Sequence, residues 1–336
     1  MKKFYVMAAF AAAFVGMTSC NNDDDVVNNS TPNQLQISSV GLENITSRAG
    51  ITADAFSNGE SLGLYIYRGA SGYTAYNDDA NGLSTENVPY TQGATWSAAQ
   101  PIILSSVEGV VYANYPYNVA NTNPAEIATT VLANQGTGQS DGTKDDTQTD
   151  YMWATPVTGI SNALPTVNLT MNHALAMVSF KFIQTTEPTL VYPGEGKVSK
   201  IVLKNKTGKS AIMIGDATMN VADGVISGGT AADAGITLSP NNSETLMDVT
   251  AAEKLPRLLL YPVAAVAADD AEVTVTVDNK NYTLDIPALA AGYAAGNNYQ
   301  YTFTLKGTGL EVTSVEITQW VDVPQTGGDI QTPDNN

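Results

Sequence analysis

The chain has 336 residues and a formal net charge of −18, from 33 acidic and 15 basic residues. Such an acidic surface repels the phosphate backbone of DNA or RNA, so we expect no nucleic acid among its partners. One histidine and one cysteine leave little with which to build a transition-metal site, so no metal and no cofactor is expected. No disulfide can form within the chain, and its stability must come from apolar burial.

The beginning of the sequence is typical of a bacterial secretory signal. Two lysines are followed by an apolar stretch, residues 4–15, which is too short to be a permanent transmembrane helix. Two small residues, Thr18 and Ser19, come directly before Cys20. This order predicts a lipoprotein signal peptide over residues 1–19, with Cys20 acylated, for example by palmitate, at the new N-terminus. The alternative is an ordinary signal peptide with a stray cysteine.

Residues 20–34 are polar and contain almost no large apolar group. Such a segment cannot pack into a core, so we expect a flexible tether after the lipid. The acidic run Asp23–Asp25 resembles a signal in lipoproteins of the Bacteroidetes that directs export to the outer face of the outer membrane. The alternative is that the acidic run belongs to a solvated linker and carries no export signal.

Most of the remaining sequence alternates apolar and polar residues, as half-buried β-strands do. Residues 272–286 contain two such runs around a polar turn and predict a β-hairpin. Short strands separated by Gly, Asn and Pro favour an all-β fold of β-sandwiches with little helix. Further strands are expected at residues 62–67, 101–104, 109–115, 198–205, 257–262 and 299–305.

One helix is predicted, over residues 123–132. Asn123 would be its N-cap, Pro124 its first residue and Glu126 the reciprocal cap. Residues 134–150 contain no apolar side chain and therefore predict an exposed loop.

The apolar positions change phase within residues 167–182. They are odd-numbered up to Met177 and even-numbered from Val178 onward. This slip predicts either a β-bulge or a strand that passes from one core to another, so we expect a domain boundary near 165–175. His173 has the apolar phase, where a packed and hydrogen-bonded residue is expected rather than a catalyst.

No catalytic arrangement is recognised in the sequence, and we expect no enzyme. A Ser-His-Asp triad would have to use His173, and no Gly-x-Ser-x-Gly elbow is present. No pair of carboxylates is marked by an apolar pocket sequence, and no glycine-rich phosphate loop is seen. The acidic run 141–150 lacks the spacing of an EF-hand and its closing glutamate, so it is interpreted as a solvated loop.

Seven motifs, in order along the chain, resemble those of the fimbrillins of the Bacteroidales, the family of Mfa-like lipoproteins and type V pilins. This resemblance implies two tandem transthyretin-like β-sandwich domains, at residues 49–168 and 169–336, in a structural or adhesive subunit of a cell-surface fimbria. The motifs do not separate stalk, tip, anchor and accessory subunits. They are ITSRAG (45–50), FSNGESLGLYIY (56–67), TWSAAQPIIL (95–104), VVYANYPYN (110–118), DYMWA (150–154), VNLTMNHALAMVSFKF (167–182) and VEITQWVDVPQTGGDI (315–330).

The resemblance also implies a route of assembly. In this family the subunit arrives as an outer-membrane lipoprotein, and an arginine-specific protease removes the segment that fills a groove as its first strand. A strand from the next subunit then fills the groove, which is donor-strand exchange. For this chain the resemblance implies cleavage between Arg48 and Ala49, loss of residues 35–48, and a fibre of identical or different subunits at the cell surface.

The first strand and the C-terminal segment share one pattern. Leu35 and Ile37 lie on one phase, and Val40 and Leu42 lie on the other. The same slip occurs in the C-terminal segment, residues 310–330, which we predict to be the donor strand. The alternative is that each segment is an ordinary strand of its own domain. The predicted donor residues are Leu310, Val312, Val315, Ile317, Val321 and Val323.

A monomeric, surface-exposed lipoprotein that binds glycans is the alternative function. Sixteen tyrosines, with Trp96, Trp153 and Trp320, could form a platform for sugars. Most of these aromatic residues lie on strand phase, so core packing is the simpler account of them.

Overall fold

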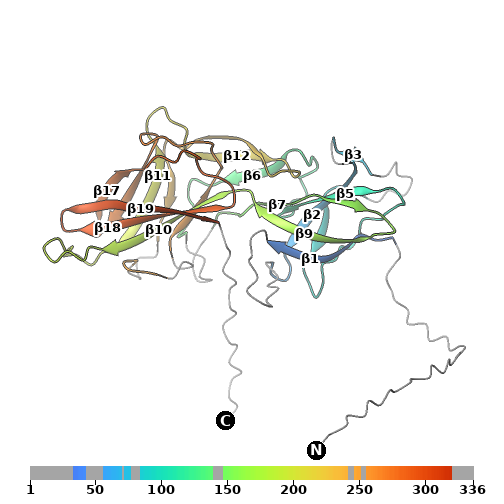
Figure 1. Cartoon of the computed structure of the whole chain (residues 1–336), viewed down its shortest axis with the longest axis horizontal. Coiled ribbons are helices and arrows are strands. Elements are labelled where there is room, and N and C mark those ends of the chain that lie inside the picture. The colour runs from blue at the N-terminus through green and yellow to red at the C-terminus, as the bar shows by residue number, and fades with distance from the viewer. Residues whose placement is uncertain are drawn as a thin grey trace, which may run out of the picture. The chain divides into compact units, whose positions relative to one another are not determined.

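The structure is a computed structural model that describes residues 33–42, 56–69, 72–76, 84–138, 147–240, 246–250 and 255–319 (Figure 1). These residues form nineteen strands and no helix, which confirms the predicted all-β class. Five of the predicted site residues lie outside the described residues: Cys20, Arg48, Ala49, Val321 and Val323.

An eight-stranded sheet is formed by the first part of the chain. Its order is β1-β9-β7-β5-β2-β3, with β4 paired to β2 and β8 paired to β5. β1 and β9 run parallel, whereas β2 is antiparallel to both β4 and β5. The strands are β1 (Gln36–Leu42), β2 (Ser61–Arg68), β3 (Thr74–Ala75), β4 (Val88–Thr91), β5 (Gly109–Tyr115), β7 (Met152–Ala154), β8 (Val157–Ile160) and β9 (Thr166–His173).

Three smaller sheets are formed mainly by the second part of the chain. Their orders are β15-β10-β18-β19, β14-β11-β16-β17 and β13-β12-β6. Their strands are β6 (Ile127–Val131), β10 (Ala176–Gln184), β11 (Val198–Asn205), β12 (Met213–Met219), β13 (Ile226–Ala231), β14 (Ile236–Leu238), β15 (Arg257–Leu260), β16 (Ala271–Val277), β17 (Lys280–Asp285), β18 (Asn297–Lys306) and β19 (Gly309–Gln319).

In both parts of the chain, the residues that form the core recur at every second position of the strands. Alternate residues of β2, such as Leu62 and Leu64, lie in the N-terminal core, because neighbouring side chains of a strand point to opposite faces. Alternate residues of β16, such as Val273 and Val275, lie in the C-terminal core in the same way. The other face of β2 is also buried, in a third cluster that includes Tyr65.

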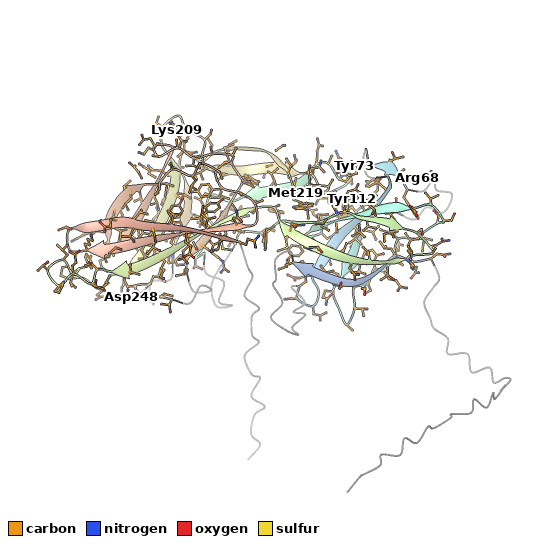
Figure 2. All side chains as sticks on the ribbon, in the orientation of Figure 1. Arg68, Tyr73, Tyr112, Lys209, Met219 and Asp248 are labelled. Atoms are coloured by element: carbon orange, nitrogen blue, oxygen red, sulfur yellow. The ribbon has the colours of Figure 1, made fainter. Side chains whose placement is uncertain are left out.

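This third cluster joins the N-terminal sheet to the strands β6, β12 and β13. Tyr112 of β5 packs with Met219 of β12, and Tyr73 packs against them (Figure 2). The hydroxyl of Tyr73 also donates a hydrogen bond to Oδ1 of Asn220 at 2.5 Å. The two parts of the chain are therefore connected by apolar packing as well as by the backbone.

The passage from β9 to β10 explains the change of phase in the sequence. Leu169 and Met171 of β9 lie in the N-terminal core, whereas Val178 and Phe180 of β10 lie in the C-terminal core. Of the two predicted explanations, a bulge or a change of core, the structure shows the second.

The predicted helix over residues 123–132 is wrong. Oδ1 of Asn123 accepts a hydrogen bond from the N–H of Ala125, and its Nδ2 donates to Glu126, so the capping residues form a turn. β6 follows this turn and pairs with β12. Its residues include the β-branched Ile127, Thr129, Thr130 and Val131, which favour a strand once a partner strand is present.

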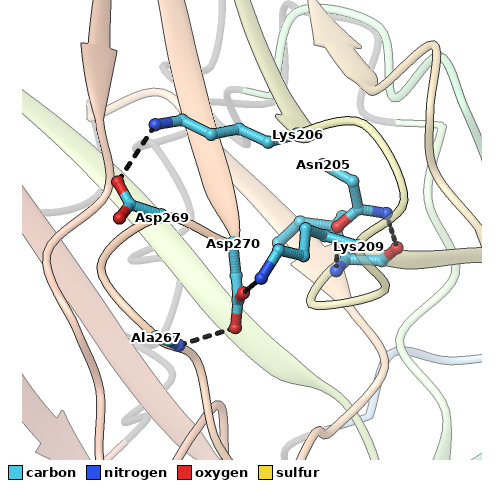
Figure 3. Close-up of polar contacts among 7 residues, drawn as sticks. Asn205, Lys206, Lys209, Ala267, Asp269 and Asp270 are labelled. Carbon is cyan, nitrogen blue, oxygen red and sulfur yellow. Dashed lines mark hydrogen bonds and ion pairs between the residues drawn. The ribbon is translucent and has the colours of Figure 1, made fainter.

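Figure 3 shows a group of polar contacts between the loop that follows β11 and the loop before β16. Lys209 forms an ion pair with Asp270 at 2.8 Å, and Lys206 pairs with Asp269 at 3.4 Å. The amide of the buried Asn205 donates to the carbonyl of Ile212 and accepts from its N–H, at 2.8 and 2.7 Å. Since exposed ion pairs contribute little, the buried amide is the contact that fixes this loop.

Candidate functional site

The best candidate site is the place that β1 occupies in the N-terminal core. Figure 1 shows β1 beside β9, with which it pairs in parallel. The side chains of Leu35, Ile37, Val40 and Leu42 are only 2, 7, 5 and 9% exposed and pack in one core with β2, β5 and β9. The first strand is therefore part of the core and does not lie on its surface.

A register shift allows both phases of this segment to face the core. Ile37 lies opposite Val167, but Ser39 lies opposite Asn168, so one extra residue is inserted between the paired positions. Such a β-bulge rotates the strand, and Val40 regains the inward direction of Ile37. This bulge explains why the apolar positions of residues 35–42 change phase in the sequence.

The start of β1 is also held on its other edge, by residues 102–104. The N–H of Leu35 donates to the carbonyl of Ile102 at 2.8 Å, and the N–H of Leu104 donates to the carbonyl of Asn33 at 2.6 Å. This segment was predicted as a strand, and it forms an isolated bridge to Gln34 instead. The start of β1 therefore has backbone partners on both sides.

Tyr90 ties these two segments together from within the core. Its hydroxyl donates to the carbonyl of Leu35 at 3.1 Å and accepts from the N–H of Ile102 at 3.2 Å. Burial raises the pKa of Tyr90 to about 12, so the hydroxyl stays protonated and able to donate at neutral pH. Sequence reasoning missed Tyr90, although its alternation with Val88 marks it as an inward-facing residue of β4.

A magnitude shows how strongly β1 is held. Burying four apolar side chains contributes about 1.5–3 kcal/mol each, or roughly 6–12 kcal/mol before the cost of ordering the strand. Backbone hydrogen bonds add about 0.5–1.5 kcal/mol apiece. Removal of β1 would therefore uncover apolar core and the edge of β9, which a strand of similar pattern could cover.

The described part of the predicted donor strand lies in a different sheet. β19 pairs antiparallel with β18 along its whole length, from Gly309 opposite Lys306 to Gln319 opposite Asn297. Its side chains are mostly exposed, and Ile317 is 53% exposed. The structure does not bring β1 and β19 into one sheet. Three predicted donor residues, Leu310, Val312 and Val315, are partly buried against the C-terminal core.

The change of phase in β19 is also a bulge. Val312 lies opposite Phe303 and Ser314 lies opposite Thr302, so Thr313 is the extra residue. The hydroxyl of Thr313 donates to the carbonyl of Thr302 at 3.2 Å and so fixes the bulge. β1 and β19 thus share a bulge flanked by apolar residues, as their sequences indicate.

His173 is buried, and its Nδ1 lies 2.8 Å from Oδ2 of Asp150. This confirms the expectation of a packed and hydrogen-bonded histidine. Among the described residues, no group of three or more histidine, cysteine or acidic side chains could hold a metal ion. The same residues include no helix that is long and apolar enough to cross a membrane.

Comparison with known proteins identifies the family. The sequence pattern described as fimbrillin-like matches residues 47–320. The chain belongs to the fimbrillin-like family. The matched region begins after β1, which ends at Leu42. A comparison with curated proteins finds no match.

Solved structures share the fold of this chain. A candidate cell adhesion protein from Bacteroides uniformis is 20% identical, with a TM-score of 0.59 over 86% of this fimbrillin-like chain and 99% of its own. A candidate cell adhesion protein from Bacteroides ovatus is 18% identical, with a TM-score of 0.60 over 87% and 98% of the two chains. At these identities the likeness shows the fold.

Replacing Tyr90 with phenylalanine should loosen the start of β1. The carbonyl of Leu35 and the N–H of Ile102 would each lose a buried partner, at a cost of about 1–3 kcal/mol. The free energy of unfolding, measured with urea, should fall by this amount. Tyr112→Phe is the control, because that tyrosine is also buried but its hydroxyl has no hydrogen-bond partner within the described part of the chain. Equal stability of the two variants would contradict the role of Tyr90.

Proposed function

We propose that this fimbrillin-like chain is a structural or adhesive subunit of a cell-surface fimbria, assembled by donor-strand exchange. The observation that carries the proposal is the placement of β1. It is buried in the N-terminal core, at the edge of a sheet, and it precedes the region that matches the family. Membership of the family and the fold shared with candidate adhesion proteins support the fimbrial role.

The precursor is proposed to be a lipoprotein, anchored in the outer membrane through Cys20. An arginine-specific protease then cleaves between Arg48 and Ala49, which follow β1 closely in the sequence. The cut releases the chain that ends at Arg48, and with it the first-strand segment, residues 35–48, which includes β1. Its loss exposes the edge of β9 and the core positions of β1, and a strand from another subunit is added there.

The donor is proposed to lie within residues 310–330. Support comes from the bulge that β19 shares with β1 and from the exposure of Ile317, which leaves its side chain open to a second partner. To donate, the segment must leave β18. The apolar side chains that it would bury in the next subunit compensate for those lost contacts. The partners are therefore other fimbrial subunits, identical or different, with sandwich domains proposed at residues 49–168 and 169–336.

Cleavage at Arg48 should start polymerisation. Limited digestion of the purified chain with an arginine-specific protease should give one dominant new N-terminus at Ala49 and ladders that resist SDS. Arg48→Ala should remain uncut and monomeric. Arg68→Ala is the matched control and should polymerise normally, because Arg68 ends the strand β2 and donates to the carbonyl of Tyr76.

Dominant cleavage at Arg68 or Arg257 would contradict the processing site. A chain that stays monomeric after cleavage at Arg48 and binds polysaccharide would favour the alternative function, a monomeric glycan-binding lipoprotein.

A charge on the donor strand should block assembly without unfolding the subunit. Ile317 is largely exposed in the subunit, so Ile317→Asp should melt close to the unchanged protein. In the apolar site of the next subunit, an unpaired carboxylate would cost several kcal/mol, and ladders should be lost. Glu316→Lys on the opposite phase is the control and should still form ladders after cleavage.

Normal ladders from Ile317→Asp would exclude residue 317 from the joint. Deletion of residues 310–336 separates the remaining possibilities. A folded monomer that cannot polymerise supports the donor role, whereas loss of the cooperative transition makes β19 a required strand of its own domain.

A further inference from the structure

A cavity of about 430 Å³ lies beside the segment that follows β5, bordered by β6 and by the residues just before β7. Its volume falls within the usual range of small-molecule sites, about 300–1,000 Å³. It shares no residue with β1, Tyr90 or β19, so binding there can be tested separately from the proposed assembly. The side chains that line it include Tyr117, Asn118, Val119, Asn121, Thr149 and Tyr151.

Asn121 is the polar group that points to a ligand. It is only 3% exposed, and its Oδ1 accepts a hydrogen bond from the N–H of Ala128 at 3.1 Å. That bond fixes the amide orientation and leaves Nδ2 as the donor. Among the described residues Nδ2 has no hydrogen-bond partner, and it is not one of the fully buried polar atoms. Water can satisfy this donor in the free protein, and a ligand oxygen placed there can accept the hydrogen bond in its stead.

Two further side chains of the cavity have hydrogen-bond donors available. Oδ1 of Asn118 accepts from the N–H of Ala120 at 3.0 Å, which leaves its Nδ2 free to donate. The hydroxyl of Tyr151 accepts from the N–H of Thr130 at 3.1 Å, so its O–H remains available. The cavity therefore suits a ligand that carries several acceptor oxygens.

The apolar surface and the charges around the cavity further restrict the class of ligand that it can bind. The ring of Tyr117 and the 75% exposed side chain of Val119 offer apolar surface beside these donors. No lining side chain carries a charge, and Asp150 lies between two lining residues in a chain of net charge −18. An anion would be repelled there and would find no cation to bind.

We propose that this cavity binds a neutral sugar that carries an acetamido group. The acetamido carbonyl accepts from Nδ2 of Asn121, and its methyl group packs on Val119. The ring hydroxyls exchange hydrogen bonds with Asn118 and Tyr151, while the apolar face of the sugar lies on Tyr117. A fimbrial subunit with this site would hold N-acetylhexosamines on its surface.

Saturation-transfer NMR on the uncleaved, full-length chain tests this inference. N-acetylglucosamine and N-acetylgalactosamine are compared with glucose and galactose, which lack the acetamido group, and with N-acetylneuraminic acid, an anion. The expected result is saturable binding of the first pair, with the strongest transfer to the acetamido methyl protons. Absence of this binding, equal binding of the plain hexoses, or preference for the anion would overturn the proposal.

Two variants locate the binding. Val119→Arg should weaken binding at least tenfold, because a long charged side chain would fill the cavity, and Val119 is too exposed for the change to disturb the core. Ala128→Arg, at an exposed position of β6 that also lines the cavity, should do the same. Leu164→Arg is the control, since Leu164 is 66% exposed and lies elsewhere.

Unchanged binding in both cavity variants would overturn the site. Because the measurement uses the uncleaved monomer, its failure would leave the proposed fibre assembly untouched. A failure of polymerisation would equally leave this site standing.

Discussion

The burial of the apolar side chains of β1 is the interaction on which the N-terminal core depends. β1 is the edge strand of the sheet, and its side chains cover the apolar residues at that edge. Four apolar residues enter the core, and the bulge after Ile37 is what allows all four to face inward. Backbone groups of β9 and of residues 102–104 are satisfied by the same segment. β1 lies at the edge of its sheet and makes a large apolar contribution, so it stabilises the N-terminal core from a position where another strand can pair with β9 if β1 is absent.

The buried residues described in the C-terminal core include none from its edge strand β19, which contributes only partly buried side chains. Phe180, Phe182 and Phe303 pack together within it, with ring centroids of Phe182 and Phe303 5.4 Å apart. β19 packs Leu310, Val312 and Val315 against this core, and an ion pair between Lys306 of β18 and Glu311 of β19 links the two strands. This difference between the two ends of the chain fits a subunit that loses one strand and lends another.

Much of the fold could be predicted from the period of the sequence. Residues 109–115 and 198–205 were predicted as strands with the bounds that the structure shows. The changes of phase were also informative, because they marked a change of core between β9 and β10 and bulges in β1 and β19. The alternation of apolar and polar residues predicts which side chains of a strand face the core, and it does so without knowledge of the partner strands.

Features that depend on distant partners could not be predicted. Residues 123–132 carry good helix-capping groups, but pairing of β6 with β12 decides their structure, and that pairing joins residues far apart in sequence. Tyr90 has no motif, and its role appears only when Leu35 and Ile102 meet at its hydroxyl. The donors of Asn121 and Tyr151 likewise converge only in the folded chain.

The central claim is that β1 fills a site which other strands of its pattern can enter. The most direct measurement is hydrogen exchange of the chain that begins at Ala49, alone and with a peptide of residues 33–48. The account predicts fast exchange of the amides of β9 and of residues 102–104 in the shortened chain, and restored protection when the peptide is added. Equal protection of these amides with and without the peptide would contradict it.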